Sequence, residues 1–348
     1  MITSGDYFTR LNERTNTRFW INNPTIDEVN LAIKFGAVNC TTNPAYCSKL
    51  ILLEKEYIHL LIDEDIFKIK DYNELADRVY RHSAKRILDC FLPIYDKSNG
   101  KQGYVTIQDD PRYDEDFDHI KMSIKENKKL GKNYMAKIPA IKVGIEVIEF
   151  CVSENIPICA TEVFSIAQAI AICNAYQNAC KKFGNNPPIY ITHISGIFDE
   201  YLEKVAKRNG IKIDENIIKQ AGVSIARKEY KLLQKYGYTL LGGGARGTHH
   251  FLQLVGGNVH ITINWSTAEE IINSQKDIVN CIEHETPKEV IDELRAKFID
   301  FDKGYEDKGL SISEFSKYGP VQLFRNSFLK GWYILLAEIA SRKNILAI

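Results

Sequence analysis

Short apolar runs alternate with amphipathic stretches along most of the chain. The amphipathic stretches, for example residues 25–36, 73–91 and 143–155, place apolar side chains at helical spacing. The short runs predict strands, because they are rich in β-branched and aromatic residues. The predicted strands are residues 18–22, 37–42, 103–108, 133–138, 156–161, 189–194, 238–243 and 259–264.

The alternation of strands and helices predicts the fold class. It is typical of an α/β protein with a parallel sheet of right-handed βαβ units. Eight strands within about 250 residues match a TIM (β/α)8 barrel. A doubly wound open sheet has the same alternation and remains the alternative. Residues 321–344 have helical apolar spacing and should pack on the barrel as an additional C-terminal helix. Because no linker rich in Pro, Gly or Ser divides the chain, residues 1–348 are expected to form a single domain.

Composition narrows the classes of partner. The 45 basic and 45 acidic residues balance, so nothing in the charge indicates a nucleic-acid partner. The N-terminus lacks the apolar segment of a signal peptide, and the longest apolar candidate, residues 158–173, is interrupted by Glu162 and Gln168. We therefore expect no membrane partner. The eight cysteines show no C-x-x-C spacing, which favours reduced thiols in a cytoplasmic protein.

Lys137 occupies an unusual place in the segment "NYMAKIPAI" (133–141). It stands inside an apolar strand, although lysine is rarely buried unless its charge is paired or used. Burial lowers the pKa of an amine and thereby makes it a nucleophile at neutral pH. The alternative is an edge strand with its lysine in water, which would be the better interpretation of this segment taken alone.

Polar residues end most of the predicted strands. In a TIM barrel the chemistry lies at the carboxyl ends of the strands, so these residues should converge. Lys137 is the sole cation among them, which favours its functional interpretation. The set is Asn22, Thr41, Thr42, Asn43, Gln108, Lys137, Thr161, Ile194, Ser195, Gly243, Gly244 and Asn264.

The glycine-rich segment "LLGGGARGTHH" (240–250) follows the seventh strand. It matches G-x-G-x-x-G, but the next strand does not end in the acidic residue that a dinucleotide site needs, and no Gly-Lys-Ser/Thr follows. We favour an anion cradle with Arg246 over a plain turn. For His249 and His250 we expect surface positions and no metal site, because neighbours on a helix point apart and no third ligand is evident.

Five segments together resemble one family of enzymes. They are "GAVNCTTNPAY" (36–46), "YMAKIPAIKVGIEVI" (134–148), "ICATEVFSIAQA" (158–169), "ISGIFDEY" (194–201) and "GGGARG" (242–247). In this order they are similar to the motifs of the transaldolase and fructose-6-phosphate aldolase family, the Schiff-base class I aldolases. The resemblance spans about residues 17 to 275 and indicates a divergent member.

The resemblance implies a set of site residues. Lys137 would form an iminium with a ketose and Thr161 would hold a catalytic water, while Asn22 and Gln108 occupy the other catalytic positions. The substrate-binding positions are Asn43, Thr42, Cys159, Ser165, Gly244 and Arg246, with Arg246 on a phosphate. The resemblance implies neither a metal nor an organic cofactor.

Three of these positions, and Ile197 in addition, depart from the family pattern. Asn22 and Gln108 stand where typical transaldolases have Asp and Glu, although the aldolase branch resembles this chain in having Gln. Cys159 replaces an Asn, and Ile197 replaces a second phosphate arginine. Because an amide does not transfer protons at neutral pH, another group must do so. The candidates for proton transfer are a water bound to Thr161, His193, and the pair Asp109 and Asp110. For this pair, a position in a solvated loop is slightly favoured over a catalytic role.

The expected function is that of a transaldolase-like enzyme of carbohydrate metabolism, of the pentose phosphate type. It would cleave a phosphorylated ketose reversibly and transfer a dihydroxyacetone-type unit to an aldehyde. The alternatives are an aldolase that releases the free ketone and a catalytically silent barrel that binds sugars or a protein. The expected partners are small sugar phosphates, and a homo-oligomer is left open.

Overall fold

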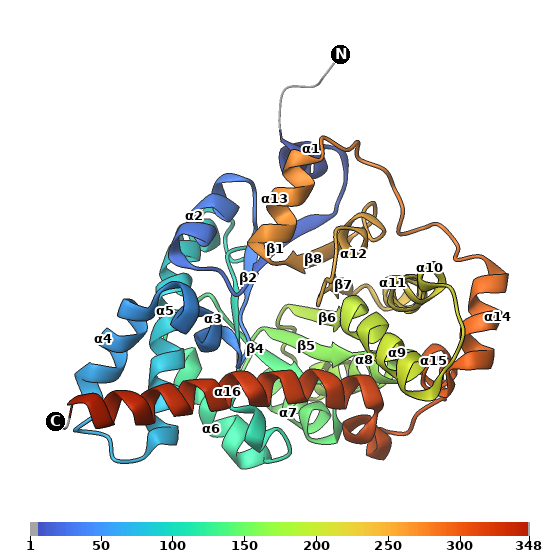
Figure 1. Cartoon of the computed structure of the whole chain (residues 1–348). Helices are drawn as coiled ribbons and strands as arrows, with labels where there is room; N and C mark the ends of the chain where they lie inside the picture. The colour runs from blue at the N-terminus through green and yellow to red at the C-terminus, as the bar shows by residue number, and fades with distance from the viewer. Residues whose placement is uncertain (1–5, 347–348) are drawn as a thin grey trace.

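The centre of the molecule is a closed barrel of eight parallel strands, in a computed structural model that describes residues 6–346 (Figure 1). Each strand pairs with the next in sequence, and β1 pairs with β8. The prediction of a TIM barrel is confirmed, and the open-sheet alternative is wrong. The strands are β1 (Arg18–Asn22), β2 (Asn39–Thr41), β3 (Val105–Gln108), β4 (Tyr134–Pro139), β5 (Ile158–Val163), β6 (Ile189–His193), β7 (Thr239–Gly242) and β8 (Val259–Ile263).

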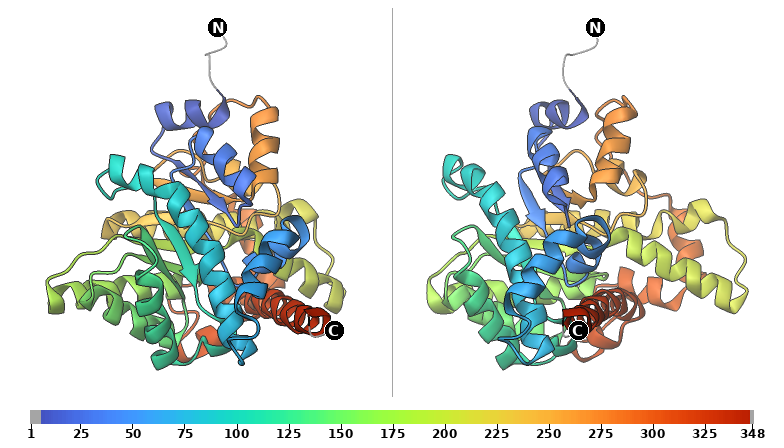
Figure 2. Two further views of the ribbon diagram at one scale, coloured as in Figure 1. Left: turned by 90° about the vertical axis from the view of Figure 1, so that its left-hand side faces the viewer. Right: turned by 60° about the vertical axis from the view of Figure 1, so that its left-hand side comes forward.

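Helices surround the barrel on its outer side (Figures 1 and 2). They are α1 (Tyr7–Arg14), α2 (Ile26–Lys34), α3 (Tyr46–Leu53), α4 (Lys55–Asp65), α5 (Tyr72–Lys97), α6 (Phe117–Lys128), α7 (Lys142–Ser153), α8 (Ile166–Phe183), α9 (Ser195–Asn209), α10 (Glu215–Ile218), α11 (Ala221–Tyr236), α12 (His249–Leu252), α13 (Trp265–Asn273), α14 (Lys288–Lys297), α15 (Ile299–Tyr305) and α16 (Gly319–Leu346). The short 3-10 helices of the described residues are η1 (Pro111–Tyr113) and η2 (Ile312–Lys317).

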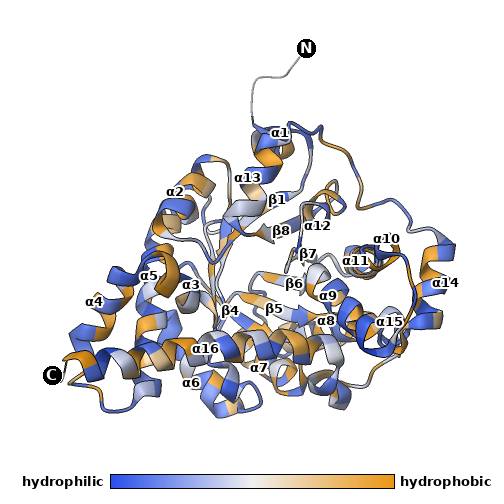
Figure 3. Ribbon diagram, viewed as in Figure 1, coloured by the Kyte–Doolittle hydropathy of each residue, from blue (hydrophilic) through white to orange (hydrophobic). Residues whose placement is uncertain are grey.

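Local sequence signals set the ends of several helices. Thr25 and Glu28 form a capping box at the start of α2, and Ser165 caps α8. Gly184 and Gly210 end α8 and α9 in the left-handed conformation. Between these ends the helices carry both apolar and polar residues (Figure 3), and their buried residues are mainly the apolar ones. Burial of these apolar faces is the main stabilising contribution of the barrel's outer layer.

Helix α16 crosses the barrel after the eight strands are complete (Figure 1). It contacts α3, α5 and α9, and it buries Trp332, Leu335 and Ile339. An added Cβ on Gly331 would lie 2.6 Å from the Cα and Cβ of Ala45, so only a glycine allows this close approach. The expectation of an additional C-terminal helix on the barrel is confirmed. Within residues 6–346, none of the helices combines the length and apolarity needed to cross a membrane.

Large side chains fill the lower half of the barrel interior. Trp20, Met135, Cys159, Tyr190 and Leu241 are buried in one cluster there. Because alternate residues of a strand face the same side, the next inward residues along β1 and β4 are Asn22 and Lys137. The upper half of the interior is therefore polar, above an apolar floor.

Candidate active site

A cavity of about 170 Å³ lies at the carboxyl ends of the barrel strands. Its walls come from the ends of β1, β2, β4, β5, β6, β7 and β8, the loops that follow them, and from α16. The strand-end residues that the sequence singled out are thus brought together around one space. The lining residues are Asn22, Asn23, Thr41, Asn43, Ala45, Lys137, Thr161, Thr192, Ile194, Gly243, Gly244, Ala245, Arg246, Thr262, Ile263, Asn264, Phe324, Ser327 and Phe328.

Lys137 points into this cavity from β4. Ala136 and Ile138 belong to the hydrophobic core between the barrel and its surrounding helices. Because side chains alternate along a strand, Lys137 between them points into the barrel. The residue is 6% exposed, and the closed barrel gives β4 a neighbour on both sides. The interpretation of an edge-strand lysine in water is therefore wrong.

Burial and two close contacts set the environment of the Lys137 amine. The Nζ atom donates to the carbonyl oxygen of Thr42 at 3.2 Å and lies 5.7 Å from the centroid of the Phe328 ring. Burial lowers the pKa of Lys137, while the neighbouring Cys159 and Glu162 oppose this effect. A buried amine with a lowered pKa is the form of lysine that attacks carbonyl carbon atoms.

Asn22 is fixed in one orientation at the end of β1. Its Oδ1 accepts a hydrogen bond from Thr41 Oγ1 at 2.9 Å, and its Nδ2 donates to Asn264 Oδ1 at 2.9 Å. Thr41 also shares a hydrogen bond of 2.7 Å with Thr262 Oγ1. An amide has both a donor and an acceptor for this network, whereas an ionised carboxylate could not donate to Asn264.

Asn43 lines the cavity from the loop after β2. Its Oδ1 accepts from Asn23 Nδ2 at 3.1 Å and from the Ala45 amide at 3.0 Å. These bonds hold the side chain and leave its Nδ2 as the group that can donate to a ligand. The geometry therefore fits a residue that binds hydroxyl groups.

The backbone of β5 is irregular next to Thr161. Its register with β6 shifts between Ala160 and Val163, and Glu162 has a φ of 61°. Thr161 lines the cavity, and its Oγ1 is buried without a hydrogen-bond partner among residues 6–346. The irregularity turns the Glu162 side chain toward Gln108, whose Nε2 donates to Glu162 Oε1 at 2.9 Å.

Glu162 is the residue that sequence reasoning missed. Strict alternation from Thr161 would place it outside the barrel, so the sequence marks it only as an interruption of an apolar stretch. The available signal is a lone carboxylate directly after the predicted strand 156–161, within an apolar stretch. Glu162 is fully buried, and its Oε2 has no hydrogen-bond partner in the described part of the chain.

Burial raises the pKa of Glu162 to about 7. The hydrogen bond from Gln108 and the charges of Lys137 and Arg325 oppose this rise. Asp114, on the loop after β3, is also buried, and its Oδ2 lies 3.2 Å from Arg325 Nε of α16. Its pKa is raised well above the ordinary value by burial and then by the charge of Glu162. A carboxyl group with a pKa of about 7 thus interacts electrostatically with the buried amine, from a position just outside the cavity lining.

The glycine-rich segment forms the wall of the cavity beyond β7. Gly244 has a φ of 66°, and a Cβ there would lie 2.3 Å from Ile194 Cγ2. Only glycine fits, and Ile197, 3.2 Å from that Cβ position, fills the neighbouring space with an apolar side chain. Arg246 lines the cavity with its side chain 47% exposed, and its Nε donates to Glu200 Oε2 at 2.7 Å.

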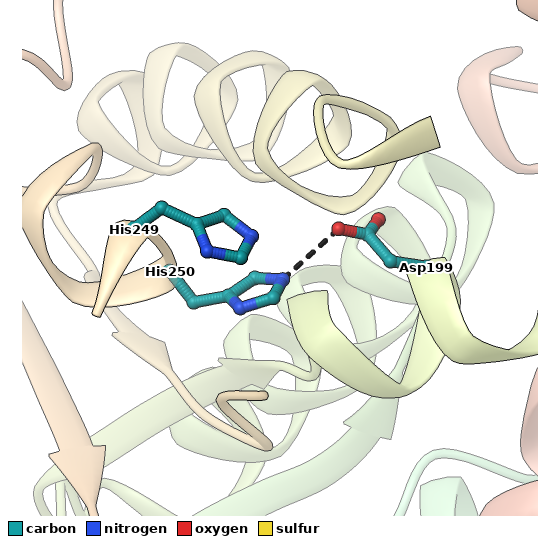
Figure 4. A group of neighbouring side chains, drawn as sticks. All are labelled: Asp199, His249 and His250. Atoms are coloured by element: carbon teal, nitrogen blue, oxygen red, sulfur yellow. Dashed lines mark hydrogen bonds and ion pairs between the residues drawn. The ribbon is translucent and has the colours of Figure 1, made fainter. Parts of the chain in front are cut away.

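His249 and His250 lie together with Asp199 behind this segment (Figure 4). The centroids of the two imidazole rings are 3.9 Å apart, and His250 is 3% exposed. The expectations that the two rings point apart and that both lie at the surface are wrong, because the short helix α12 begins at His249 and packs His250 inward. Asp199 supplies the third possible ligand, with all three ligand atoms within 4.8 Å of one another.

The hydrogen bonds of His250 argue against a metal centre. Its Nδ1 accepts from the backbone N–H of Arg246 at 3.2 Å, so its proton lies on Nε2. That Nε2 donates to Asp199 Oδ2 at 2.9 Å (Figure 4). A metal on Nε2 would have to displace this proton and leave an anionic ring. The Asp199–His250 pair instead holds the backbone of the segment that contains Arg246.

Four of the expected site residues lie outside the cavity lining as far as residues 6–346 define it. The Thr42 side chain bonds to Tyr80 and to the Thr106 carbonyl, so that only its own carbonyl oxygen reaches Lys137. Ser165 caps α8, and Cys159 lies 3.2 Å from Thr192 Oγ1 beneath the cavity. Gln108 reaches the site through Glu162.

The other groups considered for proton transfer also point elsewhere. His193 Nδ1 lies 3.2 Å from Glu229 of α11, and both residues are fully buried outside the barrel interior. Asp109 accepts from Ser123 Oγ at 2.5 Å, and Asp110 forms an ion pair with Arg112. Burial raises the pKa of Asp109 to about 7, but its partners lie on α6. Each of these groups is thus engaged away from the cavity.

Comparison with known proteins gives a consistent set of matches. The family model described as Transaldolase/Fructose-6-phosphate aldolase matches residues 19–316. Curated relatives named "Transaldolase" include those of Trichodesmium erythraeum, 28% identical over 220 residues, and Mycobacterium bovis, 25% identical over 207 residues. The alignment with the first relative covers 57% of this chain and 57% of that relative. The alignment with the second covers 56% of this chain and 54% of that relative. The chain therefore spans little more than half the length of the curated relatives it matches.

Proposed function

Because the chain belongs to the transaldolase/fructose-6-phosphate aldolase family, we propose that Lys137 forms a Schiff base with a ketose and that the protein catalyses reversible aldol cleavage. The observation that supports this most directly is the position of Lys137, a buried amine of lowered pKa that faces a polar cavity at the strand ends. Isolated cations are costly to bury, so a lysine retained there needs a chemical use.

The cavity supplies what a Schiff-base mechanism requires around the amine. The neutral Nζ attacks the ketone carbon, and the resulting protonated iminium withdraws electrons as the adjacent C–C bond breaks. Asn22 and Asn43 offer fixed amide groups to the hydroxyls of the sugar chain. Phe324 and Phe328 of α16 border the same cavity and limit the access of water to the amine.

The proposed substrates are ketoses that carry a phosphate. Gly243, Gly244 and Arg246 lie at one end of the cavity, where glycines leave the backbone accessible and the guanidinium supplies positive charge. A phosphate there would compete with Glu200 for Arg246. Ile197 provides no second cation, so we expect binding of the phosphate to depend strongly on Arg246.

Two fates of the cleaved unit are compatible with this site. We favour transfer of a dihydroxyacetone-type unit to an aldehyde, which places the protein in carbohydrate metabolism of the pentose phosphate type. Release of the free ketone is the second candidate, and the amide of Gln108 favours it, because the aldolase branch resembles this chain at that position. A catalytically silent barrel is disfavoured, since binding alone gives no reason to bury Lys137.

Trapping with borohydride tests the Schiff base. The protein is incubated with fructose 6-phosphate, sedoheptulose 7-phosphate and dihydroxyacetone, reduced, and measured by intact mass and peptide mapping. We expect one reduced adduct on Lys137 and none in Lys137→Met. Lys182→Met, which removes a lysine paired with Glu149 on the outer surface, should retain the adduct. An adduct on a different lysine, or none with any of the three ketoses, would refute the proposal.

A further inference from the structure

We propose that Glu162, turned into the barrel by the irregularity of β5, is the acid–base group that exchanges protons with the Lys137 amine and the substrate bound to it. This inference rests on the proposed Schiff-base function. It assigns to β5 the proton-transfer role that Asn22 on β1 and Gln108 on β3 cannot perform as amides.

The backbone of Glu162 is held in a costly conformation. A φ of 61° is uncommon for a residue with a side chain and is destabilising relative to glycine. The register shift between Ala160 and Val163 accompanies it. Such strain persists where the surrounding structure enforces it, and it concentrates at functional sites. Strand alternation would direct the Glu162 carboxylate outward. The irregularity instead turns it toward Gln108, at the carboxyl end of the barrel.

The surroundings of the side chain orient one oxygen and give the other no hydrogen-bond partner among residues 6–346. Gln108 Nε2 donates to Oε1 at 2.9 Å, while Oε2 is buried without a hydrogen-bond partner among residues 6–346. Gln108 and Lys137 are paired residues in the register of β3 and β4. The amide at position 108 thus serves the carboxylate, because a Glu there would place a second acid against Glu162. A buried carboxylate oxygen without a partner is a costly feature that a bound substrate or water would relieve.

Charged groups approach Glu162 from three elements. They are Lys137 of β4, Asp114 on the loop after β3, and Arg325 of α16. Asp114 pairs with Arg325, which leaves Lys137 as the cation available to Glu162. In the free protein the Nζ donates to Thr42 instead, so the proton passes when the amine leaves that carbonyl or through one intervening water.

The proton balance of Schiff-base formation uses both forms of Glu162. The carboxylate first takes a proton from the Lys137 ammonium, which gives a neutral amine and a carboxylic acid. The neutral amine adds to the ketone carbon. One proton then moves from the nitrogen to the former ketone oxygen, which gives the carbinolamine with its hydroxyl group. The acid then protonates that hydroxyl, the C–O bond breaks, and water leaves. The products are the protonated iminium, one water, and the regenerated carboxylate, so the proton lost by the ammonium leaves in the water.

The first test compares the wild-type protein with Glu162→Gln, which can keep the hydrogen bond from Gln108. Rapid mixing with the ketose and quenching with borohydride measures the rate of adduct formation, and kcat and KM are measured from pH 5 to 9. We expect adduct formation and kcat to fall by roughly 10²- to 10⁴-fold with little change in KM. The limb of the pH profile near 7 should disappear. A rate within threefold of the wild-type rate, with that limb unchanged, would overturn the role of Glu162.

Glu162→Gly provides a second test that does not depend on the first variant folding. Glycine accepts a φ of 61° without strain, so this variant removes the carboxyl group while relaxing the backbone. We expect a slow enzyme whose rate increases when formate is added, because formate can enter the vacated space as a proton carrier. A folded variant whose rate is normal, or whose lost rate formate never restores, would contradict the proposal.

Glu229→Gln is the matched control. Glu229 is also fully buried with a raised pKa, but it pairs with His193 outside the cavity. The kcat and the pH profile of the Glu229→Gln variant should stay close to those of the wild type. Failure of the two hypotheses can be told apart: a wild-type protein without any adduct refutes the Schiff base, whereas a normal adduct with an unimpaired Glu162→Gln variant refutes only the role of Glu162.

Discussion

At the scale of single residues, the site combines one buried amine with amides where carboxylates would be the simpler choice. The hydrogen bonds of Asn22 and Gln108 explain this choice, because each amide donates to a neighbouring oxygen. A carboxylate at either position would lose that donor and bring negative charge against an acceptor. Each amide therefore has a specific hydrogen-bonding role at the end of its strand, which argues for a retuned site rather than a decayed one.

Arg246→Ala should raise KM for phosphorylated ketoses by roughly ten- to a hundred-fold, since one charge-assisted hydrogen bond contributes about 1.5–3 kcal/mol. Non-phosphorylated ketoses should show nearly unchanged kinetics. The measurement is kcat and KM for fructose 6-phosphate and for fructose or dihydroxyacetone. Lys204→Ala is the control, because Lys204 also pairs with Glu200 but does not line the cavity. Equal losses for both kinds of substrate would remove Arg246 from the phosphate role.

At the scale of elements, α16 joins the fold to the site. Its Phe324, Ser327 and Phe328 border the cavity, while Gly331, one turn further along, lies against the loop that follows β2. The helix therefore has to approach this loop closely before its aromatic residues can reach the space above Lys137. An element that follows the eight-stranded barrel in sequence thus forms part of the cavity wall.

Gly331→Ala tests this coupling. Helix propensity alone would stabilise the variant by about 1 kcal/mol. The new Cβ, however, would lie 2.6 Å from Ala45, and overpacking of this kind costs about 1–3 kcal/mol. We expect a lower Tm and a higher KM, because Ala45 itself lines the cavity. Ser341→Ala, at an exposed position of the same helix, should leave both unchanged or raise Tm slightly. A more stable Gly331→Ala variant with normal KM would show that the close approach is dispensable.

At the scale of the whole molecule, several acids are buried where ionisation is unfavourable. Burial raises the pKa of Asp109 and of Glu162 to about 7, and those of Asp199 and Glu229 are also raised. In the unfolded chain these groups ionise near pH 4. Between about pH 4 and 7 the unfolded state therefore releases protons that the folded state retains, so these acids make the protein less stable as the pH rises.

Asp109→Asn should reduce this loss of stability. The amide oxygen can still accept from Ser123 and Asn127, which both bond to Oδ1. At pH 8 we expect a higher Tm than that of the wild type. The free energy of unfolding should increase by an amount on the order of a few kcal/mol, because each pKa unit corresponds to about 1.36 kcal/mol. The difference should shrink toward pH 4, where Asp109 is protonated in both states. Thermal unfolding curves at five pH values measure this, and two parallel profiles would contradict the raised pKa.

The sequence by itself determined the elements and the location of the amine. All eight strands lie within two residues of their predicted ends, because strand period and turn residues are local properties. The convergence of strand ends in a TIM barrel predicted that Lys137 and Asn22 share one site, and both line the cavity. The resemblance of five short segments was sufficient to indicate the family, which the match over residues 19–316 shows.

Only the tertiary structure decided which side chains meet, since contacts between distant segments depend on closure and packing. Pairing of β4 with both β3 and β5 turned Lys137 from a possible edge residue into a buried one. A single irregularity in β5 reversed the direction of Glu162, and alternation along the strand could not reveal it. The tertiary fold brought His250 of α12 to Asp199 of α9. In each case the deciding contact joins residues that are remote in sequence or breaks the period that sequence reasoning relies on.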